Sequence, residues 1–376
     1  MIRGVVKGDV TFVKIGEKIS GFQISLLLFT FIVSTLILSV PGIMVGYAKQ
    51  DAWMSVILAS TTGLLNIFVM TALAIRYPGQ TIIQYASAIC GKWVGKLIGF
   101  YCTYYLFFFI SSTVNEHAGF LNTVLMINTP SLVLILTLLI FCSLAVLSGV
   151  ESIARCNEVI VMIVVLLLLP IFIFSLRNVD PARLTPVLSE GIIPVIRGSV
   201  VPSAWMSQFF FLGWFLPHLN EKPQKVRGKL LFSLGCTALL IMAIDILTIM
   251  VFGPITPRMK FAFLNVIKYT DIIGPLERLE AIAITIWVLG ISIKVSMLLY
   301  MFCISATQLF GAKNYRKTVV PITVLSAVGS VWIFKNSGEF QAWITFTYPI
   351  LALFTQSLLP LALLAVDAVK QMLSKR

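Results

Sequence analysis

Charged residues are scarce in this chain of 376 residues, of which only 11% are Asp, Glu, Lys or Arg and 59% are hydrophobic. Soluble domains carry roughly a quarter of charged residues, so a water-soluble core cannot hide this much apolar surface. Long apolar runs, such as 24–42, 131–148, 159–176 and 230–252, approach the ~20 residues with which a helix crosses a bilayer. We therefore expect an all-α membrane protein.

Residues that build metal, disulfide and nucleotide sites are few or badly spaced. The chain has two histidines, and its six cysteines lie far apart without a CxxC pair. It has no GxxxxGK[ST], HExxH or GxSxG motif and no glycine-rich nucleotide loop after a strand. We expect no metal, no cofactor and no enzymatic activity. The net charge of +13 resides in short loops between apolar runs, which argues against nucleic acid as a partner.

The apolar runs predict about ten transmembrane helices. When alternate loops are assigned to opposite sides, most of the 28 lysines and arginines fall on one side, and the positive-inside rule places both ends in the cytoplasm. The first run is too long and begins too late for a cleaved signal peptide. The expected spans are approximately 21–47, 53–75, 97–124, 131–149, 157–176, 198–219, 229–253, 279–309, 318–334 and 344–370.

Two connections on the outer side, 177–197 and 253–278, are longer than a helical hairpin needs. Both contain apolar residues, so we expect them to fold back over the outer face as lids. The connection at 177–197 also divides the ten spans into two sets of five. The expected organisation is a cytoplasmic segment at 1–20, a first repeat at 21–176, the connection, a second repeat at 198–370 and a cytoplasmic tail at 371–376.

The first and sixth spans are both expected to be interrupted in mid-membrane. Ser34 and Thr35 precede a Pro-Gly pair in span 1, and Ser207 and Gln208 precede Gly213 and a proline in span 6. Interruptions at matching places in two halves are typical of inverted-repeat transporters with a central substrate site. An unwound turn frees backbone groups and points helix ends at a charged ligand, which suits a small zwitterion. The alternative is that these residues are ordinary kinks of membrane helices.

Lys294 lies near the middle of span 8, too far from either end for its ammonium group to reach water easily. A charge at this depth needs a partner or a wet cavity, and Asp245 in span 7 is a candidate partner. The alternative is a structural pair that holds two spans together. Ser296 and Tyr300 share a helical face that Lys294 does not, so the two hydroxyls are assigned to the ligand and Lys294 to a supporting site.

Span 3 contributes further polar groups. Tyr101 and Tyr105 share one helical face and are candidates for one wall of a polar cavity, although packing at the membrane interface is the commoner role of tyrosine. Glu116 and His117 are candidates for a proton relay, but as neighbours on a helix they point in different directions and are expected near the outer end of the span.

Short motifs along most of the chain resemble the B subunit of GerA-type spore germinant receptors, a branch of the amino acid/polyamine/organocation permease superfamily. The motifs lie mostly in the connections, at Gln50–Trp53, Arg76–Thr81, Gly91–Gly95, Thr129–Pro130, Gly149–Glu151 with Arg155, Leu184–Val187 with Gly191, and Glu277–Glu280 with Trp287, Lys294 and Tyr300.

The resemblance implies a LeuT-like inverted repeat of five plus five helices, located in the spore inner membrane and acting with an A subunit and a C-subunit lipoprotein. It implies that the protein senses a nutrient such as an amino acid and triggers germination. The family usually has a glycine-rich break in span 1 and an acidic residue nine positions before the span 6 proline, where this chain has Ser34-Thr35-Leu36 and Gln208. The expected ligand site comprises Ser34, Thr35, Leu36, Tyr101, Tyr105, Ser207, Gln208, Phe209, Ser296 and Tyr300, supported by Lys294 and Asp245.

Three functions remain open from the sequence. A sensing subunit would bind its nutrient without accumulating it, and pass a change in helix arrangement to partner subunits. An amino acid permease, coupled to protons or facilitative, would take up labelled substrate alone. An ion or water conduit opened by partners would use the hydroxyls along spans 1, 3, 6 and 8.

Overall fold

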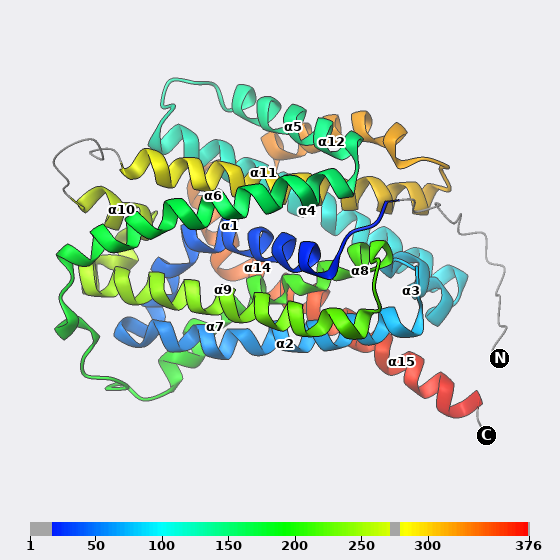
Figure 1. Ribbon diagram of the computed structural model, residues 1–376, viewed down its shortest axis with the longest axis horizontal. Helices are drawn as coiled ribbons and strands as arrows, with labels where there is room; N and C mark the ends of the chain where they lie inside the picture. The colour runs from blue at the N-terminus through cyan, green and yellow to red at the C-terminus, as the bar shows by residue number, and fades with distance from the viewer. Residues whose placement is uncertain (1–16, 271–278, 375–376) are drawn as a thin grey trace.

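The computed structural model describes residues 17–270 and 279–374, and nearly all of them are helical (Figure 1). The parts of the expected N-terminal segment, second outer connection and C-terminal tail at 1–16, 271–278 and 375–376 lie outside the described residues. Helices dominate because only a helix satisfies its own backbone polar groups in lipid. The α-helices are α1 (Gly21–Ala48), α2 (Ala52–Arg76), α3 (Ile82–Cys90), α4 (Lys92–Val124), α5 (Ser131–Ser148), α6 (Val150–Ser175), α7 (Ile193–Met206), α8 (Leu212–Phe215), α9 (Pro223–Phe252), α10 (Ala262–Tyr269), α11 (Leu279–Phe310), α12 (Val319–Trp332), α13 (Ser337–Ala342), α14 (Tyr348–Ala352) and α15 (Leu359–Ser374).

The expected spans coincide with helices to within a few residues, except that α4, α6, α7 and α9 begin about one to two turns earlier, and the last span begins two turns earlier, with α13. Seven helical stretches of the described chain are long and apolar enough to cross a membrane, and the longest, Gly21–Arg76, joins α1 and α2. Two expected spans are not among the seven, because span 6 is broken and α12 has only 14 residues. The chain is a multi-pass membrane protein, and the count of ten stays a prediction.

The long helices run side by side, and the start of α1 lies toward the same end of the bundle as the end of α15 (Figure 1). Helix α1 lies inside the bundle, where it contacts α6, α7, α9 and α11. Its central residues are buried almost without exception. The division into two repeats at 177–197 is not tested by these contacts and stays a prediction.

The predicted interruption of span 1 is wrong, because α1 is one continuous helix that contains Pro41. The hydroxyl of Ser34 donates to the carbonyl of Phe31 within the same helix (3.2 Å), which is how Ser and Thr are commonly satisfied in membrane helices. Span 6 is interrupted as predicted. Helix α7 ends at Met206, and a 3₁₀ turn (Ser207–Phe211) separates it from the single turn of α8.

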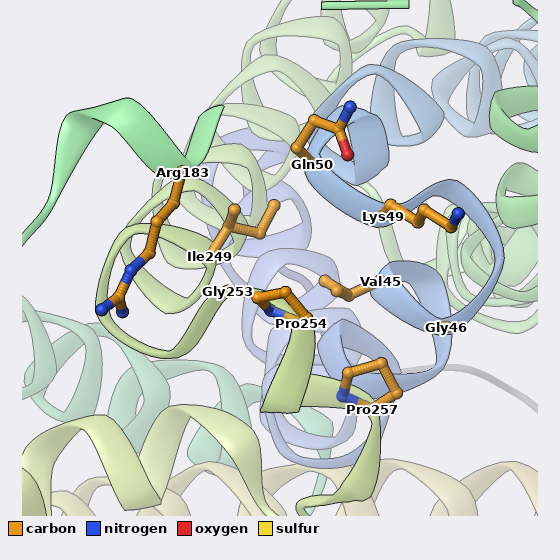
Figure 2. Close-up of a pocket in the computed structure, with 9 residues that line it drawn as sticks. All are labelled: Val45, Gly46, Lys49, Gln50, Arg183, Ile249, Gly253, Pro254 and Pro257. Carbon is orange, nitrogen blue, oxygen red and sulfur yellow. The ribbon is translucent and has the colours of Figure 1, made fainter. Parts of the chain in front are cut away.

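The first long connection, 177–197, lies against the turn between α1 and α2 and against the end of α9. Asp51 accepts two hydrogen bonds from the backbone N–H of Leu188 (both 3.1 Å), and Gln50 donates to the carbonyl of Pro186 (2.7 Å). Arg183 donates to the carbonyl of Met250 (3.3 Å) near the end of α9. A cavity of about 230 Å³ remains beneath it, and Figure 2 shows Arg183 and Lys49 extending away from each other on opposite sides of this cavity. The connection therefore folds back over this end of the bundle; that this end faces outward stays a prediction.

Helices α3 and α4 form a tight corner that depends on two glycines. Gly91, with φ of 87°, occupies the left-handed region that reverses the chain between them. One turn into α4, a Cβ placed on Gly95 would lie 2.2 Å from the Cα of Ser87. The two helices can therefore pack this closely only because Gly95 has no side chain.

Replacing Gly95 by Ala is expected to destabilise the protein by about 1–3 kcal/mol, because the backbone of α3 must shift to admit the new methyl group. Thermal unfolding of the purified protein in detergent measures the effect. Gly119→Ala on the same helix is the matched control, since a Cβ at Gly119 meets nothing within 4 Å. Equal melting temperatures for the two variants would contradict this account of the corner.

Candidate functional site

The centre of the bundle holds a lysine bound to two polar side chains from different helices. The Nζ atom of Lys294 in α11 donates to the hydroxyl of Thr35 in α1 (2.7 Å) and to the side-chain carbonyl of Gln208 in the span 6 break (3.2 Å). Lys294 and Gln208 are fully buried, and Thr35 is 3% exposed. We call Thr35, Gln208 and Lys294 the central cluster. Both hydrogen-bond partners are neutral, so the ammonium charge is not cancelled by them.

Aromatic rings surround the ammonium group of Lys294. Its Nζ atom lies 4.5 Å from the centroid of Phe31 and 5.2 Å from that of Phe109, within the range of cation–π attraction. The indole N–H of Trp205 donates to Thr35 (2.9 Å), and the amide of Gln208 donates to the hydroxyl of Tyr348 (2.8 Å). The cluster is therefore held on a rigid aromatic frame from α1, α4, α7 and α14.

A chain of hydrogen bonds extends from the span 6 break to α4. Ser207 donates to Gln356 (2.7 Å), and Gln356 donates to the hydroxyl of Tyr105 (2.6 Å). Asn66 donates to the backbone carbonyl of Ser207 (2.7 Å), which lies where the helical ladder is interrupted. Side chains from neighbouring helices thus bind the polar groups exposed by the break, as buried polar groups require.

A cavity of about 360 Å³, which we call the vestibule, lies at the end of the bundle where α1 ends. Ser39, one turn beyond Thr35 on α1, and Glu116 on α4 lie on its wall, and the hydroxyl of Ser39 donates to the carboxylate of Glu116 (3.4 Å). Glu116 and Lys294 interact electrostatically. The wall of the vestibule therefore carries one acidic side chain, Glu116, that interacts with the lysine of the central cluster.

The opposite end of the bundle is closed by a network centred on Glu17. Its carboxylate accepts hydrogen bonds from the backbone N–H of Val150 (2.7 Å), from Arg316 (3.0 Å) and from Tyr315 (3.3 Å). Nearby, the hydroxyl of Tyr300 and Nε2 of His218 lie 2.9 Å apart. We call the contacts of Glu17 the inner latch. It ties the segment before α1 to α6 and to the turn before α12.

Several predicted site residues meet at the centre. Thr35 and Gln208 belong to the central cluster, and Ser207 and Tyr105 belong to the hydrogen-bond chain beside it. Tyr101 lies one turn before Tyr105 on α4, where its hydroxyl is 2.5 Å from that of Thr355.

Other predicted site residues lie elsewhere. Ser34 packs against Gly290 of α11. A Cβ placed on Gly290 would lie only 3.2 Å from the Cβ of Ser34. The hydroxyl of Ser296 donates to the carbonyl of Ser292 on its own helix (2.8 Å), and Tyr300 lies near the inner latch. Leu36 and Phe209 are fully buried apolar side chains of the core, without polar atoms to offer a ligand.

Lys294, which the sequence assigned to a supporting site, bonds directly to two of the predicted ligand residues, Thr35 and Gln208, and its role as support or ligand contact stays a prediction. Lys294 and the Ser296–Tyr300 face do point in different directions, but Lys294 is the residue that points to the centre. The suggested pair of Lys294 with Asp245 does not form. Asp245 is fully buried, and neither of its carboxylate oxygens has a hydrogen-bond partner among the described residues.

Sequence reasoning did not find the aromatic frame. Phe31, Phe109, Trp205 and Tyr348 carry no spacing that distinguishes them from the chain's other aromatic residues. Gln356 lies in a π-helical turn (Leu353–Leu358), a feature that often marks functional sites but has no sequence signature here. Of the proposed relay pair, Glu116 faces the vestibule, whereas His117 stacks on Trp287 with ring centroids 5.4 Å apart.

Residues 18–337 match the family described as spore germination protein. Spore germination protein KB of Bacillus subtilis (strain 168) is 26% identical over 328 residues, which cover 86% of this chain and 87% of that protein. Spore germination protein YndE of the same organism is 26% identical over 305 residues, covering 79% and 82%. Spore germination protein A2 is 23% identical over 336 residues, covering 87% and 88%.

Two solved transporter structures have the same fold. MHP1, a nucleobase-cation-symport-1 family transporter in a closed conformation with bromovinylhydantoin bound, aligns with a TM-score of 0.64 at 12% identity, over 96% of this chain and 81% of that chain. MhsT in complex with L-phenylalanine aligns with a TM-score of 0.60 at 14% identity, over 91% and 89%. The LeuT-like fold class expected from the sequence is confirmed.

Proposed function

Because the chain belongs to the spore germination protein family, we propose that it is a nutrient-sensing subunit of a germinant receptor. It binds a small zwitterion such as an amino acid between the vestibule and the central cluster, and the bound nutrient triggers germination.

The observation that carries this proposal is the order of charges along the path into the protein. A ligand entering through the vestibule meets Glu116 and then Lys294, which interact electrostatically with each other. An α-amino acid carries an ammonium and a carboxylate a few ångströms apart, so it can pair with both. Its carboxylate replaces the neutral partners of Lys294, and its ammonium pairs with Glu116. Such charge-assisted bonds are stronger than neutral ones, particularly away from water.

The aromatic frame supports the same ligand class. Phe31 and Phe109 present apolar rings beside Lys294 and offer contact for a small side chain or for an ammonium group. Both rings are buried, so contact with them removes ligand surface from water. A ligand that bears two charges and a modest apolar side chain fits these surroundings better than a sugar or a nucleotide, for which the described cluster offers no set of matching donors.

Signalling follows from which elements the ligand would join. The central cluster connects α1, the span 6 break and α11, so a ligand that binds one arrangement of these elements more tightly shifts the population toward it. In this proposal the shift passes to an A subunit and a C-subunit lipoprotein in the spore inner membrane. Both ends of the chain face the cytoplasm, and the subunit acts without a cofactor and without catalysing a reaction.

The alternative function is amino acid transport, coupled to protons or facilitated. It is favoured by one feature: the vestibule opens on one side of the central cluster, while the inner latch closes the other. This asymmetry suits alternating access as well as it suits sensing. Transport requires that the latch open while the ligand is bound.

A paired assay separates the two functions. Spores lacking the gene are expected to lose germination in response to the cognate amino acid, whereas cells expressing this chain alone are expected to show no saturable uptake of the labelled compound. The responsive amino acid is identified first by screening the twenty common ones on wild-type spores. Saturable uptake together with normal germination of the deletion spores would refute the receptor proposal and establish transport.

A further inference from the structure

An apolar groove opens on the side of the bundle between α6 and α9, with α1 as its floor. Figure 1 shows α6, α1 and α9 side by side, and α1 contacts both of the others. The groove has a volume of about 370 Å³ and is lined by Leu26, Phe29, Val165, Phe172, Phe232 and Cys236, among others. All of these residues belong to the long apolar stretches that cross the membrane. The groove therefore faces lipid hydrocarbon.

The few polar groups of the groove are already satisfied. The hydroxyl of Ser25 donates to the carbonyl of Phe22 (2.7 Å), and that of Ser233 donates to the carbonyl of Ser25 (2.8 Å). Both hydroxyl protons are thus used within the protein, and the other side chains that line the groove are apolar apart from the thiol of Cys236. An unbranched hydrocarbon chain suits the groove, whereas packed transmembrane helices usually meet through small residues or interhelical hydrogen bonds.

The face of α9 that lines the groove continues into lysines at the start of the helix. Lys225 and Lys229 precede Phe232 by seven and three residues, so at helical spacing they lie on the same face, and Lys222 caps this end. Arg227 is on the other face, where it donates to Thr71 on α2 (3.1 Å) and makes no contribution to the groove.

Two of these lysines are not held in an ion pair, although Lys225 interacts electrostatically with Glu221. Lys229 pairs with Glu221 (2.6 Å), and this bond, with the backbone N–H of Gly21, holds the pKa of Glu221 below its usual range. Lys222 and Lys225 are exposed and form no ion pair among the described residues. Glu158 on α6, on the other wall, accepts a hydrogen bond from Gln23 (3.3 Å). The charge at this end of the groove on α9 is therefore positive.

From these observations we propose that the groove is a phospholipid site, in which one acyl chain lies between α6 and α9 and the phosphate is bound by Lys222 and Lys225. The occupant would pack against the half of α1 that precedes Thr35. It would therefore support the helix that carries one member of the central cluster. On the proposed orientation the lipid comes from the cytoplasmic leaflet.

Native mass spectrometry of the full-length protein, purified in detergent and titrated with phosphatidylglycerol, tests the proposal. One lipid is expected to bind more tightly than the rest. The double variant Lys222→Gln/Lys225→Gln is expected to weaken this binding by about thirtyfold, from the contribution of each lysine near an anionic headgroup. Cys236→Trp is expected to abolish binding of this lipid, because the indole ring fills the groove.

Matched controls are Lys313→Gln/Lys317→Gln, two exposed lysines before α12, and Leu144→Trp on the lipid-facing side of α5. Both are expected to bind the lipid as the wild type does. Equal binding by all variants would overturn the proposal, because it would mean that lipid adheres without a defined site. Should Cys236→Trp fail to fold, the double lysine variant remains decisive.

Photo-crosslinking identifies the occupant in native membranes. Phe22 also lines the groove but is 50% exposed, so a label there lies beside the space of the acyl chain rather than in it. In a Phe22→Cys variant in which Cys90, Cys156 and Cys236 are replaced by Ser, labelling with benzophenone maleimide and irradiation is expected to give an adduct with the mass of a phospholipid. An adduct with another protein would overturn it and show that a partner helix covers the groove.

Discussion

Replacing Lys294 by Met is expected to abolish the nutrient response of spores and to raise the dissociation constant of the nutrient by at least about thirtyfold. In the proposed complex, Lys294 pairs with the carboxylate of the nutrient. Truncating one partner of such a buried charge pair costs about 2–5 kcal/mol of binding free energy. Met keeps the length and apolar contacts of the lysine stem, and removing a fully buried charge relieves its desolvation. The variant is therefore expected to assemble in the membrane at a normal level, which an immunoblot of spore membranes measures.

Binding to purified Lys294→Met, measured by titration calorimetry, separates loss of the ligand from loss of signalling. Lys313→Met is the control, because Lys313 is exposed at the inner end of α11 and touches neither the vestibule nor the cluster. Wild-type affinity in Lys294→Met would place the carboxylate of the nutrient elsewhere. Glu116→Gln extends the test: it is expected to weaken binding of an amino acid more than binding of the corresponding acid without its amino group.

Ser39→Trp is expected to block the nutrient response by closing the inner end of the vestibule. Ser39 is 7% exposed and lies between the vestibule and Thr35, so an indole ring there occupies the path of the ligand. Binding would then require displacement of an overpacked side chain at a cost of about 1–3 kcal/mol, which corresponds to a loss of affinity of about 5- to 150-fold. The concentration of nutrient that gives half-maximal germination measures the effect.

The smaller variant Ser39→Ala is the matched control, since it removes only the hydroxyl that reaches Glu116 at 3.4 Å. It is expected to stay close to wild type. Tryptophan at Ser34 or Ser207 would be a poorer test, because Ser34 packs against α11 and Ser207 is bonded to Gln356 in the fully buried core. A normal response of Ser39→Trp at normal protein level would show that the nutrient does not enter through the vestibule.

The sequence predicted the membrane helices well because each one is a long apolar run, and such runs depend on composition alone. It also identified Thr35 and Gln208, since polar residues in mid-membrane are costly and therefore conspicuous. It did not predict that α1 stays continuous past Pro41. Whether a helix unwinds depends on what neighbouring helices offer its polar groups, and the Trp205–Thr35 contact joins residues 170 positions apart.

Lys294 shows where reasoning from helical faces fails. The predicted angle between Lys294 and Ser296 around the helix axis was correct. That angle alone does not say which of the two opposed faces points to the centre of the bundle. That choice follows from packing: Ser296 satisfies its hydroxyl on its own helix, whereas the ammonium of Lys294 needs Thr35, Gln208 and two aromatic rings. The aromatic frame was missed for the same reason, since apolar rings are common throughout the chain and only their position distinguishes them.

The inner latch also bears on how sharply the protein responds. One carboxylate, that of Glu17, holds Val150, Tyr315 and Arg316 together, so these contacts cannot be released one at a time without leaving Glu17 short of partners. The latch therefore couples the segment before α1, the start of α6 and the turn before α12 through a single side chain. On the proposed function, nutrient binding has to overcome these three contacts together, so sparse encounters with nutrient would leave the latch closed and set a threshold for the response.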